Sequence, residues 1–142
     1  MHNSPRIVLD TNCLLISIPC SSPYHTILMA FLSGAYTLCI TNEILLEYEE
    51  ILTKKMNKVV ASNIVNAILS SRYTLLINPV YRFRLIESDP DDNKFVDCAI
   101  HANAHYIVTE DHHYNILEQI PFPNINVIDI DQFNQLIKNR IC

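Results

Sequence analysis

The sequence alternates short apolar runs with longer segments of helical periodicity, and this alternation restricts the fold more than any other feature. Ile7-Val8-Leu9 is an apolar run that is too short for a helix and is typical of a strand covered on both faces. The same pattern predicts strands at residues 36–40, 73–77, 106–108 and 125–128. Strand–helix–strand units of this length favour an α/β fold, an α/β/α sandwich whose four to five strands form a mostly parallel sheet.

Helix signals occupy the segments between these strands. Ser22-Pro23 indicates an N-cap followed by proline at the first helical position, and Gly34 indicates a C-terminal cap. We expect helices at residues 24–33, 43–55, 58–71, 91–103 and 114–119, with Thr41 or Asn42 capping the second, Asp89-Pro90 starting the fourth, and a last helix capped by Asp131. Linkers, repeats and low-complexity tracts are not evident, so residues 1–142 are predicted to form a single domain.

The composition excludes several classes of function. The sequence has one glycine, so loops that need several glycines to bring backbone close to a phosphate are ruled out. Its net charge of −5 argues against bulk electrostatic binding of nucleic acid but leaves metal-dependent chemistry open. Five cysteines without a C-x-x-C pair, and the absence of a long apolar segment, lead us to expect a cytoplasmic protein with reduced thiols and no membrane contact.

Acidic residues fall where an open α/β sheet binds its ligands, at the carboxyl ends of the strands. Asp10 ends the first strand, and Thr109 and Asp111 follow the fourth. Asp92 lies in the first turn of the helix before that strand and shares the apolar face of the helix, so it is predicted to point inward. Carboxylates that converge at one point need a cation to stay ionised, and hard oxygen ligands select Mg²⁺ or Mn²⁺.

Two further acids and two histidines are harder to place. Glu47 flanks the apolar stripe of its helix, where it can look into a cleft, whereas Asp97 is expected to face outward. His101 and His105 have a spacing that can bind zinc, but a surface pair is the favoured interpretation because no third ligand is suggested.

Each acid also has an ordinary structural explanation. Asp10 or Asp111 could cap a turn or a short helix, Asp92 could be satisfied by a helix N-terminus, and Glu47 could lie on a solvated flank. These explanations are independent of one another, and nothing in them requires the four acids to occur in this order. The combination therefore favours a metal site.

Four motifs together resemble one family. They are I-V-L-D-T-N at residues 7–12, T-N-E-I-L-L-E-Y-E-E-I-L at 41–52, D-P-D-D-N-K-F-V-D-C-A at 89–99 and Y-I-V-T-E-D at 106–111. In this order and spacing the chain resembles a PIN domain, in the group of toxins of toxin–antitoxin systems related to the VapC-like ribonucleases. The resemblance covers essentially residues 6–130.

The resemblance implies a site and an activity. Its acidic positions correspond to Asp10, Glu47, Asp92 and Asp111, of which Asp10, Asp92 and Asp111 would hold one or two Mg²⁺ or Mn²⁺ ions. Asn12 and Thr109 would orient the first and last carboxylates, with Asp97 in a supporting role. The implied activity is metal-dependent endoribonucleolytic hydrolysis of RNA by a toxin, with an antitoxin protein and a homodimer as further partners. One departure is Glu110, which stands where relatives often have glycine and either adds a carboxylate to the site or points away.

Two other functions remain open. One is a PIN-like domain that has lost catalysis and serves as a binding or assembly module. The other is a phosphatase of the haloacid dehalogenase type, which also begins with an Asp after its first strand but requires a second Asp where this chain has Asn12. The cations available for substrate phosphates are Lys54, Lys55, Lys58, Arg82, Arg84 and Lys94.

Overall fold

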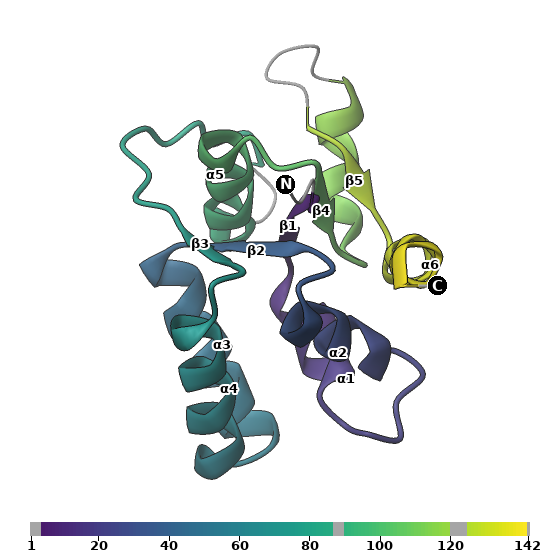
Figure 1. The fold of residues 1–142 in the computed structure, drawn as a ribbon. Coiled ribbons are helices and arrows are strands. Elements are labelled where there is room, and N and C mark those ends of the chain that lie inside the picture. The colour runs from purple at the N-terminus through teal and green to yellow at the C-terminus, as the bar shows by residue number, and fades with distance from the viewer. Residues whose placement is uncertain (1–3, 87–89, 120–124, 142) are drawn as a thin grey trace.

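The computed structural model describes residues 4–86, 90–119 and 125–141 and contains a parallel sheet with helices on both faces (Figure 1). The sheet has five strands in the order β3-β2-β1-β4-β5, and every neighbouring pair is parallel. The strands are β1 (Arg6–Leu9), β2 (Thr37–Ile40), β3 (Thr74–Leu76), β4 (Tyr106–Val108) and β5 (Val127–Ile128). The predicted α/β/α architecture is confirmed.

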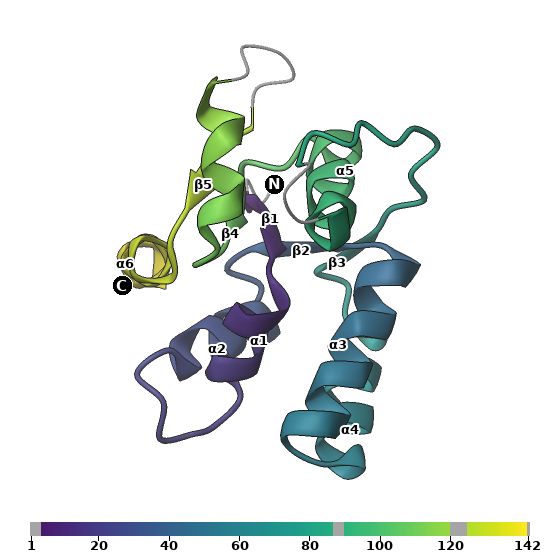
Figure 2. The same ribbon diagram turned by 180° about the vertical axis from the view of Figure 1, so that it is seen from behind.

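The helices separate into layers on the two sides of the sheet. They are α1 (Thr11–Ser17), α2 (His25–Ser33), α3 (Asn42–Lys55), α4 (Lys58–Ser70), α5 (Asn93–Ala102) and α6 (Ile130–Ile141), with short 3₁₀ helices η1 (Pro90–Asp92) and η2 (His112–Gln119). Figures 1 and 2 show α5 on one side of the sheet and α1 to α4 on the other. Strand β1 lies between these layers, and Ile7, Val8 and Leu9 are fully buried, as expected for a strand covered on both faces.

Several element boundaries differ from the predictions. Helix α1 was not predicted; it begins directly after β1 because the Asp10 side chain accepts a hydrogen bond from the Thr11 amide and caps it. Helix α2 begins at His25, since the Ser22 hydroxyl accepts from the Tyr24 amide and makes a turn before the helix. Strand β3 is shorter than predicted, spanning only Thr74–Leu76.

The predicted caps of the other helices are partly confirmed. Thr41, one of the two predicted alternatives, caps α3 by accepting from the Ile44 amide. The prediction that Asp131 caps α6 is wrong. Asp129 accepts from the Gln132 amide at 2.7 Å while the Gln132 side chain accepts from the Asp129 amide at 2.9 Å, which is a reciprocal cap two residues earlier. The predicted cap Asp89 lies outside the described residues.

The sheet topology creates a crevice at the carboxyl ends of β1 and β4. From β1 the chain crosses to β2 on one side, whereas from β4 it crosses to β5 on the other, so this junction is the point at which strand order reverses. Leu9 is in register with Val108, and the Asp10 amide donates to the Val108 carbonyl at 3.0 Å. Asp10 and Thr109 are thereby brought side by side although 98 residues separate them in the chain.

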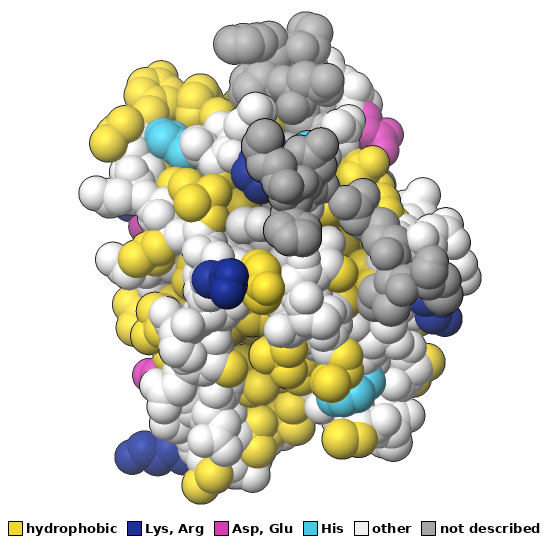
Figure 3. Space-filling view, in the orientation of Figure 1, with side chains coloured by type: hydrophobic (Ala, Val, Ile, Leu, Met, Phe, Trp, Pro, Cys, Tyr) yellow, Lys and Arg dark blue, Asp and Glu magenta, His cyan; other side chains and the backbone are white. Residues whose placement is uncertain are grey.

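Large apolar side chains remain exposed on several helices. Those at least half exposed on α2, α3 and α4 include Met29, Leu46, Val59 and Leu69. Apolar side chains also spread across the lower part of the face shown in Figure 3, where acidic ones are sparse. Within the described residues, none of the helices combines the length and apolar character that crossing a bilayer requires.

Candidate active site

A cavity of about 430 Å³ lies at the crevice, and its walls are mostly acidic. Its lining residues come from the end of β1, the start of α1, the second and third turns of α3, η1 and the segment after β4. They are Asp10, Thr11, Asn12, Glu47, Ile51, Asp91, Asp92, Glu110 and Asp111. The four acids predicted as catalytic are thus brought together, although they come from four separate parts of the chain.

Asp10 is held rigidly at the centre of this cavity wall. Its Oδ1 accepts from the Thr11 amide at 2.8 Å, and its Oδ2 accepts from the Thr109 hydroxyl at 2.7 Å. Burial raises the pKa of Asp10 above its usual value, the two hydrogen bonds oppose this rise, and repulsion from Glu47 and Asp111 adds to it. A bound cation would relieve the cost of ionising this carboxylate.

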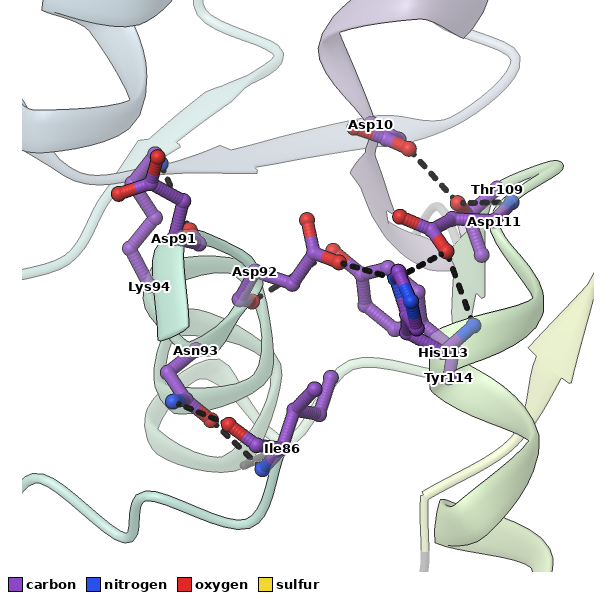
Figure 4. A network of polar contacts seen from close by, with 10 residues as sticks. All are labelled: Asp10, Ile86, Asp91, Asp92, Asn93, Lys94, Thr109, Asp111, His113 and Tyr114. Atoms are coloured by element: carbon purple, nitrogen blue, oxygen red, sulfur yellow. Dashed lines mark hydrogen bonds and ion pairs between the residues drawn. The ribbon is translucent and has the colours of Figure 1, made fainter. Parts of the chain in front are cut away.

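Asp92 and Asp111 face each other across the crevice together with His113 (Figure 4). One ligand atom from each of these three residues lies within 4.8 Å of the other two. His113 Nδ1 is 2.9 Å from Asp111 Oδ1 and 3.9 Å from Asp92 Oδ2. Burial raises the pKa of Asp111, but hydrogen bonds from the His113 amide and with Asp92, and the charge of the His113 ring, outweigh burial and leave it below its usual value.

Glu47 lies on the α3 side of the cavity, where both of its carboxylate oxygens have partners. Oε1 pairs with the Lys94 ammonium at 2.7 Å, and Oε2 accepts a short hydrogen bond from the Thr11 hydroxyl. The predicted flank position is therefore correct, and the side chain is turned into the cleft rather than into solvent.

The donor set on the β4 side fits a hard divalent ion. Ligand oxygens about 2.1 Å from an octahedral ion lie roughly 3.0 Å apart when adjacent and roughly 4.2 Å apart when opposite. The two separations from His113 Nδ1, 2.9 Å to Asp111 Oδ1 and 3.9 Å to Asp92 Oδ2, are close to these values. Carboxylates suit Mg²⁺ and Mn²⁺, and the nearby imidazole is more compatible with Mn²⁺ than with Mg²⁺.

Asn12, Thr109 and Glu110, which stand next to the acids in the sequence, have different outcomes. Asn12 is exposed at the cavity wall, and among the described residues it makes no side-chain hydrogen bond to Asp10. Thr109 does orient Asp10, and its hydroxyl also accepts from the Asp111 amide at 3.0 Å. Glu110 lines the cavity but turns one oxygen to the Ile130 amide at the start of α6, 2.8 Å away.

Asp97 corrects a prediction. We expected an outward-facing residue, but the side chain is 3% exposed and its Oδ1 accepts from the Phe83 amide at 3.0 Å. Helical periodicity failed here because residues 80–83 fold over that face of α5 and supply a backbone donor. Asp97 does not line the cavity, and its support of the site remains a prediction.

The two histidines of the predicted surface pair have separate roles. Helix α5 ends at Ala102, so His105 lies beyond it, where its Nδ1 accepts from the Arg6 amide at 2.9 Å. His101 remains on α5, and its Nε2 lies 3.3 Å from the amides of Val80 and Tyr81. Both are used in backbone contacts, which agrees with the structural interpretation rather than with zinc.

Three residues of the site have roles that sequence reasoning did not assign to them. Thr11 holds Glu47, Lys94 pairs with it, and His113 joins Asp92 and Asp111. Signals for two of them are present: Thr11 follows Asp10 directly, and His113 is two residues after Asp111. The contact of Lys94 with α3 depends on helix placement and has no signal in the sequence.

Comparison with known proteins identifies the class that this fold and cavity define. The sequence model of the PIN domain matches residues 6–113, more than half of the chain. The chain therefore belongs to the PIN domain family, whose members are typically metal-dependent nucleases. Membership in this family excludes the alternative of a phosphatase of the haloacid dehalogenase type.

Solved structures agree on the fold. A chain of the VapBC2 complex from Rickettsia felis, bound to a DNA fragment from its promoter, superposes with a TM-score of 0.57 at 20% identity, covering 87% of this chain and 98% of that one. The PIN domain of RRP44 from T. brucei superposes with a TM-score of 0.56 at 12% identity, covering 96% and 83%. A search of curated proteins gives no match. At these identities the likeness establishes the fold alone.

Proposed function

We propose that this chain is a metal-dependent endoribonuclease and the toxin of a toxin–antitoxin pair. The observation that supports the proposal is that Asp10, Asp92 and Asp111 line one cavity at the crevice between β1 and β4, in a family of nucleases. The structural neighbour VapBC2 is a toxin–antitoxin complex, which supports the assignment of this chain as a toxin.

The residues of the chain divide the work of phosphodiester hydrolysis. Asp10, Asp92 and Asp111 would hold Mg²⁺ or Mn²⁺, which when bound lowers the pKa of water and neutralises charge on the phosphate. Thr109 fixes the Asp10 carboxylate and the Asp111 backbone with one hydroxyl, so their spacing is set before substrate arrives. Glu47 retains lone pairs beyond its two contacts and can accept a hydrogen bond from the attacking water.

An antitoxin and a second copy of the chain remain proposed partners. The exposed apolar side chains on α2, α3 and α4 are candidate contacts for such partners, since large apolar side chains are common at interfaces. Free Cys13, Cys39 and Cys98 are buried and Cys20 is exposed, which is compatible with the expected cytoplasmic location.

The proposal is tested by incubating labelled single-stranded RNA with the protein and Mn²⁺ or Mg²⁺. Asp10→Asn and Asp92→Asn should lower cleavage by roughly 100-fold or more, because each removes a ligand charge. Glu50→Gln, an exposed neutralisation on the same helix as Glu47, is the matched control and should retain activity. Equal cleavage by all four proteins would refute the nuclease assignment.

A second assay separates the toxin from a general nuclease and from the inactive binding module. Expression of the wild type should arrest growth, and Asp10→Asn should restore it. RNA binding without cleavage at any metal concentration would instead favour the binding or assembly module.

A further inference from the structure

Lys94 is an unusual cation for this protein because it is nearly buried. Its side chain is 11% exposed, whereas Arg82 and Glu43 of the neighbouring ion pair are 59% and 52% exposed. The ammonium contacts Glu47 Oε1 at 2.7 Å and donates to the Asp91 carbonyl at 2.7 Å, and it lies 5.1 Å from the centre of the Phe95 ring. These contacts fix the charge in one position instead of leaving it mobile in solvent.

The cavity consequently has two sides with different charge. On the α3 side, one oxygen of Glu47 already contacts the positively charged Lys94 ammonium, and the other accepts a hydrogen bond from the Thr11 hydroxyl. On the β4 side, ligand atoms of Asp92, Asp111 and His113 lie within 4.8 Å of one another. Figure 4 shows that Lys94 and Asp92 leave the start of α5 in different directions.

We propose that the Lys94 ammonium occupies the place of a second divalent cation beside Glu47, so that the site holds one metal ion, on Asp10, Asp92 and Asp111. This proposal rests on the proposed function. An ion bound to Glu47 at about 2.1 Å would lie within a few ångströms of the ammonium, and repulsion between them is strong in a partly buried site. Displacing the ammonium would also break its contact with the Asp91 carbonyl.

Lys94 is accordingly a positioning residue that acts through Glu47. It holds the Glu47 carboxylate directed into the cavity without making it a metal ligand. Of the four family acids, three serve the ion and one is left for water or substrate.

The test counts metal ions. Metal-free protein is titrated with Mn²⁺, and bound ions are measured by isothermal titration calorimetry and by the electron paramagnetic resonance signal of free Mn²⁺. The wild type should bind one ion per chain. Lys94→Met keeps the length and apolar stem of the side chain but removes the charge, and it should bind a second, weaker ion. Adding Glu47→Gln to Lys94→Met should return the count to one.

Two further variants serve as controls. Lys94→Arg retains the charge and should bind one ion, and Lys54→Met removes an exposed charge from the C-terminal end of α3 and should also bind one. A thermal melt of each variant confirms that the protein counted is folded. If Lys94→Met is unfolded, Lys94→Gln gives the same charge removal with a polar end.

The outcomes separate this proposal from the proposed function. A folded Lys94→Met protein that binds one ion overturns the role of Lys94 and leaves the nuclease intact. Two ions in the wild type, falling to one with Glu47→Gln, also overturn it. No bound ion in the wild type overturns both the single-ion site and the metal-dependent nuclease.

Discussion

The sole glycine of the chain, Gly34, offers a sharp test of how α2 is joined to β2. Gly34 caps α2 with a φ of 85°, a left-handed conformation that costs an L-residue about 1–2 kcal/mol. A Cβ at this position would lie 2.5, 2.6 and 2.9 Å from three atoms of the Tyr73 ring. Since Tyr73 packs against the core, moving the ring adds about 1 kcal/mol.

We therefore expect Gly34→Ala to lower the free energy of unfolding by about 2–3 kcal/mol. The unfolding entropy of a chain this size corresponds to roughly 0.3 kcal/mol per degree, so the Tm should fall by about 7–10 °C. Urea denaturation followed by circular dichroism measures the free energy, and calorimetry measures the Tm.

A double-mutant cycle separates the two causes. In a Tyr73→Ala background the ring is absent, so Gly34→Ala should cost only the conformational part, about 1–2 kcal/mol. Gly34→Asn in the wild-type background keeps the contact of the Cβ with the Tyr73 ring but should cost less than Gly34→Ala, because Asn tolerates positive φ better than Ala. A loss below about 0.5 kcal/mol, or equal losses with and without Tyr73, would refute this reasoning.

Two further predictions concern Thr109 and the buried thiols. Thr109→Val should reduce both Mn²⁺ affinity and cleavage by roughly 10- to 100-fold, because Asp10 loses a hydrogen-bond donor and the Asp111 amide loses an acceptor. Thr109→Ser keeps the hydroxyl and should restore both. Unchanged Mn²⁺ affinity in Thr109→Val would contradict the role given to the hydroxyl. Burial raises the pKa of Cys39 from 9.0 to about 11, so the folded state keeps the thiol protonated at a pH where the unfolded chain ionises it. The Tm should therefore be unaffected by this group below pH 9 and should fall between pH 9 and 11. The fall should be less steep in Cys39→Ala.

The strands and most helices were predictable because their signals are local. Ile7-Val8-Leu9 is buried on both faces, and the apolar stripe of α3 packs as its periodicity indicates. Helix α1 was missed because no turn residue separates it from β1, and the cap that starts it, Asp10, is also a site residue. Asp10 is both the cap of α1 and a residue of the site, and its position after a strand was interpreted as that of a site residue.

The site was predictable in its acids and unpredictable in what holds them. Asp10 and Asp111 could be assigned to strand ends, and strand ends in a parallel sheet share one edge. The partners of Glu47 could not be predicted, because the contact with Lys94 depends on how α3 and α5 pack. Asp97 shows the same limit in reverse, since a long connection covers a helix face that periodicity assigns to solvent.

The scarcity of glycine and the crowding of acids both agree with the proposed function. With one glycine, committed to a helix cap, the chain has no glycine-rich loop to hold a phosphate, so in the proposed function a cation would meet the phosphate. Concentrating carboxylates for that cation is unfavourable, as the raised pKa of Asp10 records: burial is its main cause, with repulsion from Glu47 and Asp111 added. Lys94 offsets the charge at Glu47, whereas the carboxylates on the β4 side face a cavity that a divalent ion can enter. The division of charge within the cavity thus sets where an external cation stabilises the protein most.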